Sequence, residues 1–406
     1  MQILRSSGSN PLLGMAHIMR LAFAGNNLSE IASQLASRIK TNAFDSVAMM
    51  DLSIVLQLNA NPHLAIELQS DALNQQQYFE LKSNPKNPAL KLLAIMGPGE
   101  VMANTPIDFL IENSDIALSF LYLGEGLPVP TEIPEHDVAF VAVCESDQNQ
   151  NLLKHLSEVM QFWPKPFVNE PSLIAQLSRN RVSQRLASAA GVAVSDAVRV
   201  TSSQLRELGK PGDLLSFPFP VIARPLDSHA GHGLAKIDDC NQLERYLSKE
   251  NSHEYFVAPF IDYRSKDGMY RKYRIAIMDG QPFAAHMAIS RHWMVHYLNA
   301  DMLNSETNRQ TEAEFMRLFD QEFGLKHKKA FASIDQKIGL NYYSIDCAET
   351  QDGKLLVFEL DSGAVVHSMD PIDLFPYKAP QMQRVFDAFR DMLMSKADLV
   401  SRRRVA

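Results

Sequence analysis

The chain has 406 residues, more than a single hydrophobic core usually organises, so we expect two or three packed units and exclude a single small binding module. Hydrophobic residues make up 46% and charged residues 21%, which excludes an intrinsically disordered chain. The formal net charge of -8 lacks the basic surplus of nucleic-acid binding modules, and no segment has the apolar length of a membrane helix. Neither a nucleic acid nor a membrane is therefore an expected partner.

Cysteine usage indicates a reducing compartment. Cys144, Cys240 and Cys347 are far apart and form neither a disulfide framework nor a CxxC metal site. His17 and Arg20 interrupt the apolar stretch near the start, where a secretory signal has to be continuous. We therefore expect a cytoplasmic protein.

Residues 1–85 predict a helical leader, because apolar residues such as Leu28 and Ile31 recur at helical spacing. The turn at Asn61-Pro62 separates two further amphipathic stretches. This helix, turn and helix resemble one tetratricopeptide unit, but the chain shows no second copy at a fixed period. A helical cap or a surface for a protein partner is the prediction here.

Residues 86–165 predict a small parallel α/β domain, in which short apolar runs alternate with helical stretches. Ligands of such sheets lie beyond the carboxyl ends of the strands. Glu145 and Ser146 follow one of these runs and are candidate substrate contacts, although ordinary turns use the same residue types.

Residues 166–395 predict an α+β part, and residues 396–406 a solvated tail. A helical connector is expected up to Gly191, followed from Pro218 by apolar runs that end in turn residues. These runs predict a sizeable, largely antiparallel sheet with a helical insertion at 306–338 and a closing helix. The expected fold class is thus a mixture of α+β and α/β.

A glycine-containing hairpin is the first candidate site. Arg224 ends one strand, and glycines in the following loop would let backbone N–H groups approach phosphate oxygens that the arginine neutralises. The same composition also occurs in ordinary hairpins. The loop consists of Ser228, His229, Ala230, Gly231, His232 and Gly233.

Three acidic residues form the second candidate site. Asp346 lies on one strand and Glu359 and Asp361 on the next, and the last two share a face because strand side chains alternate. Converging carboxylates repel one another unless a cation lies between them, and their oxygens suit Mg²⁺ or Mn²⁺ bound to nucleotide phosphates. Neutralisation by lysine or arginine partners is the alternative.

Arg274 is the candidate for holding a transferring phosphoryl group, because a guanidinium makes bidentate contacts and is always charged. His286 and Ser290 have the strand parity to share its face. Trp293 and His296 have large amphipathic side chains, which we expect either to line a pocket or to pack in the core. His367, which follows the acidic strand, is a further substrate candidate.

These parts follow one another in a fixed order: a cation and glycine loop, an apolar linker, the arginine strand and then the three acids. This order resembles that of the ATP-grasp family. The resemblance covers 166–389, and the acid spacing is similar to that of the magnesium ligands of D-alanine:D-alanine ligase. The whole also looks like glutathione synthetase and ribosomal-protein glutamate ligase. The resemblance implies that ATP binds between two subdomains and phosphorylates a carboxylate, and that an amine then displaces the phosphate.

The resemblance also implies roles for single residues. Arg181 and Arg224 match two phosphate-binding cations that are usually lysines. Asp361 stands where the family usually has asparagine, and Lys272 stands where an acidic residue is common. The linker that would bind adenine is matched by Phe256, Val257, Ala258, Pro259 and Phe260.

The main hypothesis is an ATP- and Mg²⁺-dependent carboxylate–amine ligase acting on small-molecule or peptide substrates through an acyl phosphate. A homodimer is common in such enzymes. One alternative is a nucleotide-binding scaffold whose helical leader binds a protein. A scaffold, however, has no need of uncompensated carboxylates. The other is a kinase-like phosphotransferase.

Overall fold

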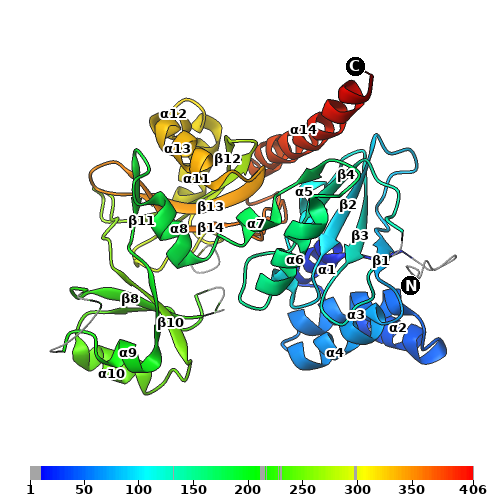
Figure 1. Cartoon of the computed structure of the whole chain (residues 1–406). Coiled ribbons are helices and arrows are strands. Elements are labelled where there is room, and N and C mark those ends of the chain that lie inside the picture. Colours follow the sequence, from blue (N-terminus) through cyan, green and yellow to red (C-terminus); the bar gives the residue numbers. More distant parts are fainter. Residues whose placement is uncertain are drawn as a thin grey trace. The chain divides into compact units, whose positions relative to one another are not determined.

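The computed structural model describes residues 11–130, 132–210, 215, 217–226, 228, 231–296 and 300–405. The chain forms two compact units (Figure 1). The first comprises Met1–Ala175, Leu340–Tyr343 and Asp361–Ala406, and the second comprises Gln176–Gly339 and Ser344–Leu360. The boundary passes through two strands, β13 (Tyr342–Glu349) and β14 (Leu355–Asp361).

A five-stranded sheet forms the centre of the first unit. Its strands stand in the order β1-β3-β2-β4-β5, with β2 to β5 parallel and β1 antiparallel to β3. β2 and β4 are almost continuously apolar and buried, as expected for parallel strands covered on both faces, so the predicted parallel α/β sheet is confirmed. The strands are β1 (Tyr78–Glu80), β2 (Leu90–Met96), β3 (Ile116–Tyr122), β4 (Val138–Val141) and β5 (Phe167–Val168).

Helices precede the sheet in the chain, as predicted for the leader. Asp45 begins α3 by accepting a hydrogen bond from the N–H of Ala48, and the Asn61-Pro62 turn begins α4. α3 packs against the three other leader helices and is buried over most of its first two turns. These helices are α1 (Met15–Phe23), α2 (Ser29–Thr41), α3 (Ser46–Leu58) and α4 (Pro62–Leu73).

Shorter helices and the C-terminal helix complete the first unit. α14 contacts α5, β4 and β5. The segment predicted as a tail from residue 396 is the end of α14 up to Val405. The elements are η1 (Val101–Ala103), α5 (Ile107–Leu110), α6 (Gln150–Met160), α7 (Pro171–Ile174) and α14 (Lys378–Val405).

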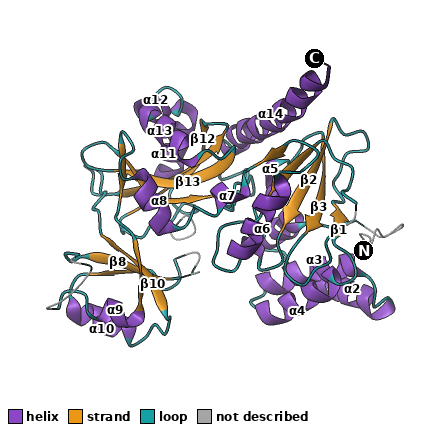
Figure 2. Ribbon diagram, in the orientation of Figure 1, coloured by secondary structure: helices purple, strands orange, loops and turns teal. Residues whose placement is uncertain are grey.

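A small antiparallel sheet opens the second unit, with strand order β7-β10-β8-β9. One face carries α9 and α10 (Figure 2) and buries the core of this sheet, including Val221, Ala223 and Val257. The opposite face of this sheet forms part of the site described below. The elements are β7 (Val198–Thr201), α9 (Ser202–Arg206), β8 (Val221–Pro225), β9 (Ala235–Ile237), α10 (Cys240–Leu247) and β10 (Glu254–Pro259).

A larger sheet follows, with the order β12-β11-β13-β14-β6. Asp279-Gly280 joins β11 to β12 with φ values of 43° and 77°, the left-handed pair that a tight hairpin needs. The helical insertion is confirmed, and its rings pack on the sheet, with Tyr273 and Phe323 4.5 Å apart between centroids. The elements are α8 (Arg179–Leu186), β6 (Val192–Val194), β11 (Tyr270–Met278), β12 (Gln281–Ser290), α11 (Glu306–Leu318), α12 (Phe323–Lys326) and α13 (Lys328–Ile338).

Two predictions about this part of the chain were wrong. The single large antiparallel sheet is two sheets, because β7 to β10 bury their apolar face under α9 and α10 while β11 to β14 pair with one another. The predicted connector helix ends early, since α8 stops at Leu186 and β6 begins after Gly191. None of the described helices combines the length and apolar composition required to span a membrane.

Candidate functional site

The β8–β9 hairpin places Arg224 on the face of the small sheet that α9 and α10 do not cover. Its neighbours Val221 and Ala223 are fully buried on the opposite face, as alternation along the strand requires. The loop returns through Gly233, whose φ is 66°, and a Cβ there would lie 2.5 Å from Cγ of Pro225. Only glycine fits this turn, so the hairpin is sterically fixed at this point.

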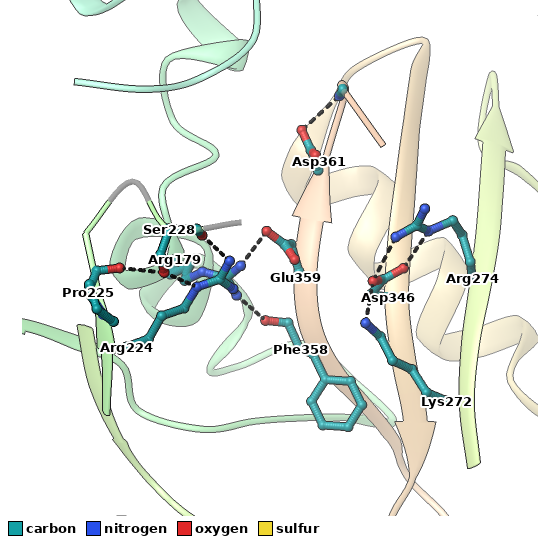
Figure 3. A network of polar contacts seen from close by, with 11 residues as sticks. Arg179, Arg224, Pro225, Ser228, Lys272, Arg274, Asp346, Phe358, Glu359 and Asp361 are labelled. Carbon is teal, nitrogen blue, oxygen red and sulfur yellow. Dashed lines mark hydrogen bonds and ion pairs between the residues drawn. The ribbon is translucent and has the colours of Figure 1, made fainter. Parts of the chain in front are cut away.

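The Arg224 guanidinium is held within its own hairpin. Nε donates to Oγ of Ser228 at 3.0 Å, and the other end of the guanidinium donates to the Ser228 carbonyl (Figure 3). Burial, followed by the nearby charge of Arg179, lowers the pKa of Arg224 to about 10. Gly231 lines the same turn and His232 is exposed, whereas His229 and Ala230 lie outside the described residues.

The predicted adenine linker is β10 and the residue after it. Phe256 pairs with Arg224 and Ala258 with Ile222 across the sheet, so both lie on the Arg224 face. Val257 is fully buried on the other face and can offer only its backbone. The N–H of Phe260 already donates to the Pro220 carbonyl at 2.9 Å, and is therefore not available to a bound base.

Pro259 belongs to the same linker, and its role is structural. Its carbonyl accepts a hydrogen bond from Ser195, which follows β6, and proline has no N–H to donate. The ring of Phe260 lies under the ammonium of Lys236 at 5.1 Å and edge-on to Trp293 at 6.0 Å. The part of the linker that remains open to a ligand is therefore aromatic and apolar.

Asp346 on β13 is paired with two cations from β11. Arg274 donates to both carboxylate oxygens at 2.7 and 3.0 Å, and Nζ of Lys272 lies 2.7 Å from one of them (Figure 3). Burial alone would raise the pKa of the Asp346 carboxyl, but the charges of Arg274 and Lys272 outweigh it and hold the pKa well below its usual range. This carboxylate is ionised and compensated.

Glu359 on β14 is paired with Arg179 at the start of α8, which also donates to the Phe358 carbonyl at 3.2 Å. Burial opposes ionisation of Glu359, yet the charges of Arg179 and Arg224 lower its pKa to about 2. Arg181, predicted as the first phosphate cation, lies instead on the exposed side of α8. The cation that contacts Glu359 is Arg179, two residues before Arg181.

Helical periodicity is the signal that would have identified Arg179. Val182, Ser183 and Leu186 are the buried residues of α8, and Arg179 precedes them at the spacings of three, four and seven that define one helix face. Arg181 falls between these positions.

These ion pairs, together with Arg224, whose charge acts on Glu359, define an ion-pair cluster within the second unit. It contains two carboxylates and four cations, so it carries a surplus of two positive charges. Partly buried guanidinium groups with such a surplus are suited to binding a polyanion, above all phosphate. The members of the ion-pair cluster are Arg179, Arg224, Lys272, Arg274, Asp346 and Glu359.

The donor set does not fit a preformed magnesium site. Asp346 and Glu359 are neutralised by cations, and Asp361 belongs to the first unit, where its Oδ1 accepts a hydrogen bond from the N–H of Gly363 at 2.7 Å. Across the described parts of the chain, no group of three His, Cys, Asp or Glu side chains is arranged to hold a metal ion. The alternative of neutralisation by lysine and arginine therefore describes the two carboxylates of the second unit.

His296, one residue of the predicted pocket wall, lies beside this cluster, and two strand residues share a face with Arg274. His286 pairs with Arg274 across β11 and β12, and Ser290 pairs with Tyr270 four residues away, so the predicted shared face is present. Burial, then the charges of Lys272 and Arg274, lowers the pKa of His296, which keeps this ring neutral at pH 7.

The other substrate candidates belong to the first unit and have local roles there. Glu145 accepts a hydrogen bond from the side chain of Gln150, and Oγ of Ser146 accepts one from the N–H of Asn149 before α6. His367 accepts a hydrogen bond from the N–H of Met369 and its ring lies 6.3 Å from that of Phe109. These contacts are typical of turns and packing.

No family model matches the chain, and no curated protein matches it. Solved structures similar to it include a D-alanine–D-alanine ligase from Bacillus anthracis complexed with ATP, with 14% identity, a TM-score of 0.48, and coverage of 78% of this chain and 100% of that chain. A second structure of that ligase has a TM-score of 0.46 at the same identity and coverage. The VanG D-Ala:D-Ser ligase from Enterococcus faecalis has 11% identity, a TM-score of 0.45, and coverage of 76% and 100%.

D-alanine ligases are among the enzymes that the sequence resemblance names. At these identities and TM-scores, the structural likeness carries no argument about the reaction of this chain.

Proposed function

We propose that the second unit binds the phosphates of ATP at the ion-pair cluster, and that the chain is an ATP-dependent carboxylate–amine ligase of the ATP-grasp type. The observation that supports this most directly is the surplus of two positive charges beside a glycine hairpin. Bidentate, permanently charged guanidinium groups recognise phosphate, and a turn that only glycine can form brings backbone N–H groups close to it.

The residues have distinct roles in this proposal. Arg224 and Arg179 hold phosphates of ATP, and the apolar linker with Phe260 packs against the base. Arg274 orients the group in transfer: a substrate carboxylate oxygen attacks the γ-phosphorus, ADP leaves, and an acyl phosphate forms. An amine then attacks the acyl carbon and loses one proton, the C–O bond to phosphate breaks, and an amide and inorganic phosphate, which takes up the proton, result. The protein contributes positioning and electrostatic stabilisation and needs no nucleophile.

Both the three acidic residues and the family resemblance predicted a magnesium ion. When bound, it would neutralise phosphate charge, but the three acids assigned to it do not form a site among the described residues. Binding is therefore to be measured with and without Mg²⁺ and Mn²⁺.

A nucleotide-binding scaffold without ligase activity is the second candidate, and one observation favours it. Uncompensated carboxylates would speak against a scaffold, but Asp346 and Glu359 are both paired with cations. Such pairs are compatible with a purely structural role. A protein partner at the leader and a homodimer stay predictions of the sequence.

Two measurements test the proposal. Equilibrium dialysis with radiolabelled ATP should show binding that weakens about tenfold or more in Arg224→Met, because a charge-assisted phosphate contact is worth roughly 1.5–3 kcal/mol. Arg245→Met, on the exposed side of α10, is the matched control and should bind as the parent does. Equal binding by all three proteins would exclude the site.

Product analysis then separates the candidate reactions. Purified protein is incubated with ATP, Mg²⁺ and defined mixtures of carboxylates and amines, and products are identified by mass spectrometry. An amide with ADP and phosphate supports the ligase, a stable phosphorylated product supports the kinase, and binding without turnover across the mixtures supports the scaffold.

A further inference from the structure

A row of charged side chains crosses three neighbouring strands of the larger sheet, β11, β13 and β14 (Figure 3). Lys272 and Arg274 lie on β11, Asp346 on β13 and Glu359 on β14. Tyr273, between the two cations, is buried against the helical insertion, as alternation along the strand requires. Two carboxylates that the sequence predicted as metal ligands therefore lie on adjacent strands of the second unit, beside two cations.

The oxygens of Asp346 already accept hydrogen bonds from these cations. Arg274 donates to Oδ1 at 2.7 Å and to Oδ2 at 3.0 Å, and Nζ of Lys272 lies 2.7 Å from Oδ2. The Asp346 side chain is 5% exposed, so protein groups rather than water satisfy it. A divalent ion at Asp346 would have to displace the Lys272 ammonium or lie beside it, and like charges at such a separation repel strongly in a partly buried site.

The charge left over in the ion-pair cluster equals that of one divalent ion. Four cations and two carboxylates leave a surplus of two positive charges. Burial and the charges of Arg179 and Arg224 dominate the pKa of Glu359, and those of Asp346 and Lys272 also affect it, so the ion pairs act on one another. A polyphosphate at this cluster would therefore meet the charge that a magnesium ion would otherwise supply.

Lys272 is the cation of the cluster best suited to replace a metal ion. The family that the sequence resembles commonly has an acidic residue here, so this chain reverses the charge at that position. An ammonium group is a compact charge with three N–H donors. Asp346 accepts one of them, and the ammonium has no second hydrogen-bond or ion-pair partner in the described parts of the chain. Two donors are left for phosphate oxygens, and the side chain is 23% exposed, which keeps it accessible to a ligand.

We propose that the Lys272 ammonium, held by Asp346, takes the place of the divalent metal ion, so that the ion-pair cluster binds a nucleoside triphosphate without one. The inference rests on the proposed nucleotide site and adds the cation that neutralises its phosphates. It replaces the magnesium ion predicted from the three acidic residues. Asp346 and Glu359 pair with cations instead, and Asp361 binds the N–H of Gly363 in the first unit.

Isothermal titration calorimetry of the full chain with the non-hydrolysable β,γ-imido analogue of ATP tests this inference. Titrations are run with excess EDTA and with excess Mg²⁺ at equal ionic strength. We expect saturable binding in EDTA, which Mg²⁺ should strengthen by less than about threefold, far below the effect of a metal ion that bridges protein and phosphates. Strengthening by that factor or more would overturn the inference and leave the nucleotide site standing. Absence of binding under both conditions would exclude the nucleotide site itself, and this inference with it.

Three variants assign the effect to Lys272. Lys272→Met should weaken binding in EDTA about tenfold or more, because it removes a charge-assisted contact. Mg²⁺ should restore part of this loss, because the ion no longer meets the ammonium. Lys272→Arg keeps the charge and should bind more tightly in EDTA than Lys272→Met. Lys266→Met, at an exposed lysine ahead of β11, is the matched control and should bind as the parent does.

Two results with the variants would overturn the role of Lys272. One is equal binding of the parent and Lys272→Met in EDTA. The other is an equal loss in Lys272→Arg and Lys272→Met, which would show that the shape of the side chain matters and its charge does not. The titrations of the parent protein decide the metal requirement even if Lys272→Met did not fold.

Discussion

Replacing Asp346 by asparagine tests the ion-pair cluster most directly. The substitution keeps the shape of the side chain but removes the charge that compensates Lys272 and Arg274, whose side chains are 23% and 22% exposed. Because the Asp346 side chain is itself only 5% exposed, the pairs count as buried, and breaking such pairs typically costs about 3–5 kcal/mol. The two cations keep some contact with solvent, so we expect the lower end, about 3 kcal/mol.

Urea-induced unfolding followed by circular dichroism measures this loss. The matched control is Asp238→Asn, which breaks the surface pair with Lys236, where Asp238 is 48% exposed and surface pairs are worth about 0–1 kcal/mol. A loss for Asp346→Asn no larger than for the control would refute the reasoning. It would mean that the two cations do not depend on Asp346 in solution.

Further predictions concern the neighbouring elements. Arg179→Met should weaken ATP binding about tenfold in equilibrium dialysis, whereas Arg181→Met should not, because only Arg179 faces the ion-pair cluster. The reverse result would support Arg181 as the phosphate-binding cation that the family resemblance implies. Both carboxylates of the cluster have folded pKa values below those of the unfolded chain, so their stabilisation is present above pH ~4 and is lost as the pH falls towards 2. Thermal midpoints should drop over that range, and a flat profile would contradict the pairing. Gly233→Ala should lower the thermal midpoint of the protein more than Gly268→Ala does. Both glycines have a positive φ, but only at Gly233 would a Cβ lie against Pro225. Equal thermal midpoints of the two variants would argue against a sterically fixed β8–β9 hairpin.

The sequence predicted the local features of the site more successfully than its pairings. Alternation along β8 is sufficient to place Arg224 opposite Ala223, and the acidic strand is recognised from its turn and parity. The partners of Asp346 could not be predicted in the same way, because they come from β11 and depend on a strand order that no local pattern specifies. Arg179 was predictable in principle from the buried face of α8.

The division of the acidic strand shows a further limit. Glu359 and Asp361 are two residues apart and share strand parity, yet the first pairs with Arg179 in the second unit and the second binds the N–H of Gly363 in the first. Strand parity predicts that the two side chains share a face, but it does not specify which of the two units each side chain contacts. A metal site inferred from spacing alone therefore requires contacts that this sequence pattern cannot specify.

The compensated carboxylates also predict how nucleotide affinity responds to the loss of Asp346. A negative charge about 6 Å from a phosphate costs roughly 2–3 kcal/mol at an effective dielectric constant of about 20. Removing it also frees Lys272 and Arg274, and fixing each again on binding costs about 1 kcal/mol. Fixing both cations therefore costs about 2 kcal/mol, which leaves a net gain of about 0–1 kcal/mol. A folded Asp346→Asn variant should thus bind ATP without divalent ions as tightly as the parent, or up to about fivefold more tightly. Weaker binding in a folded variant would show that Asp346 serves the phosphate site by holding its cations in place.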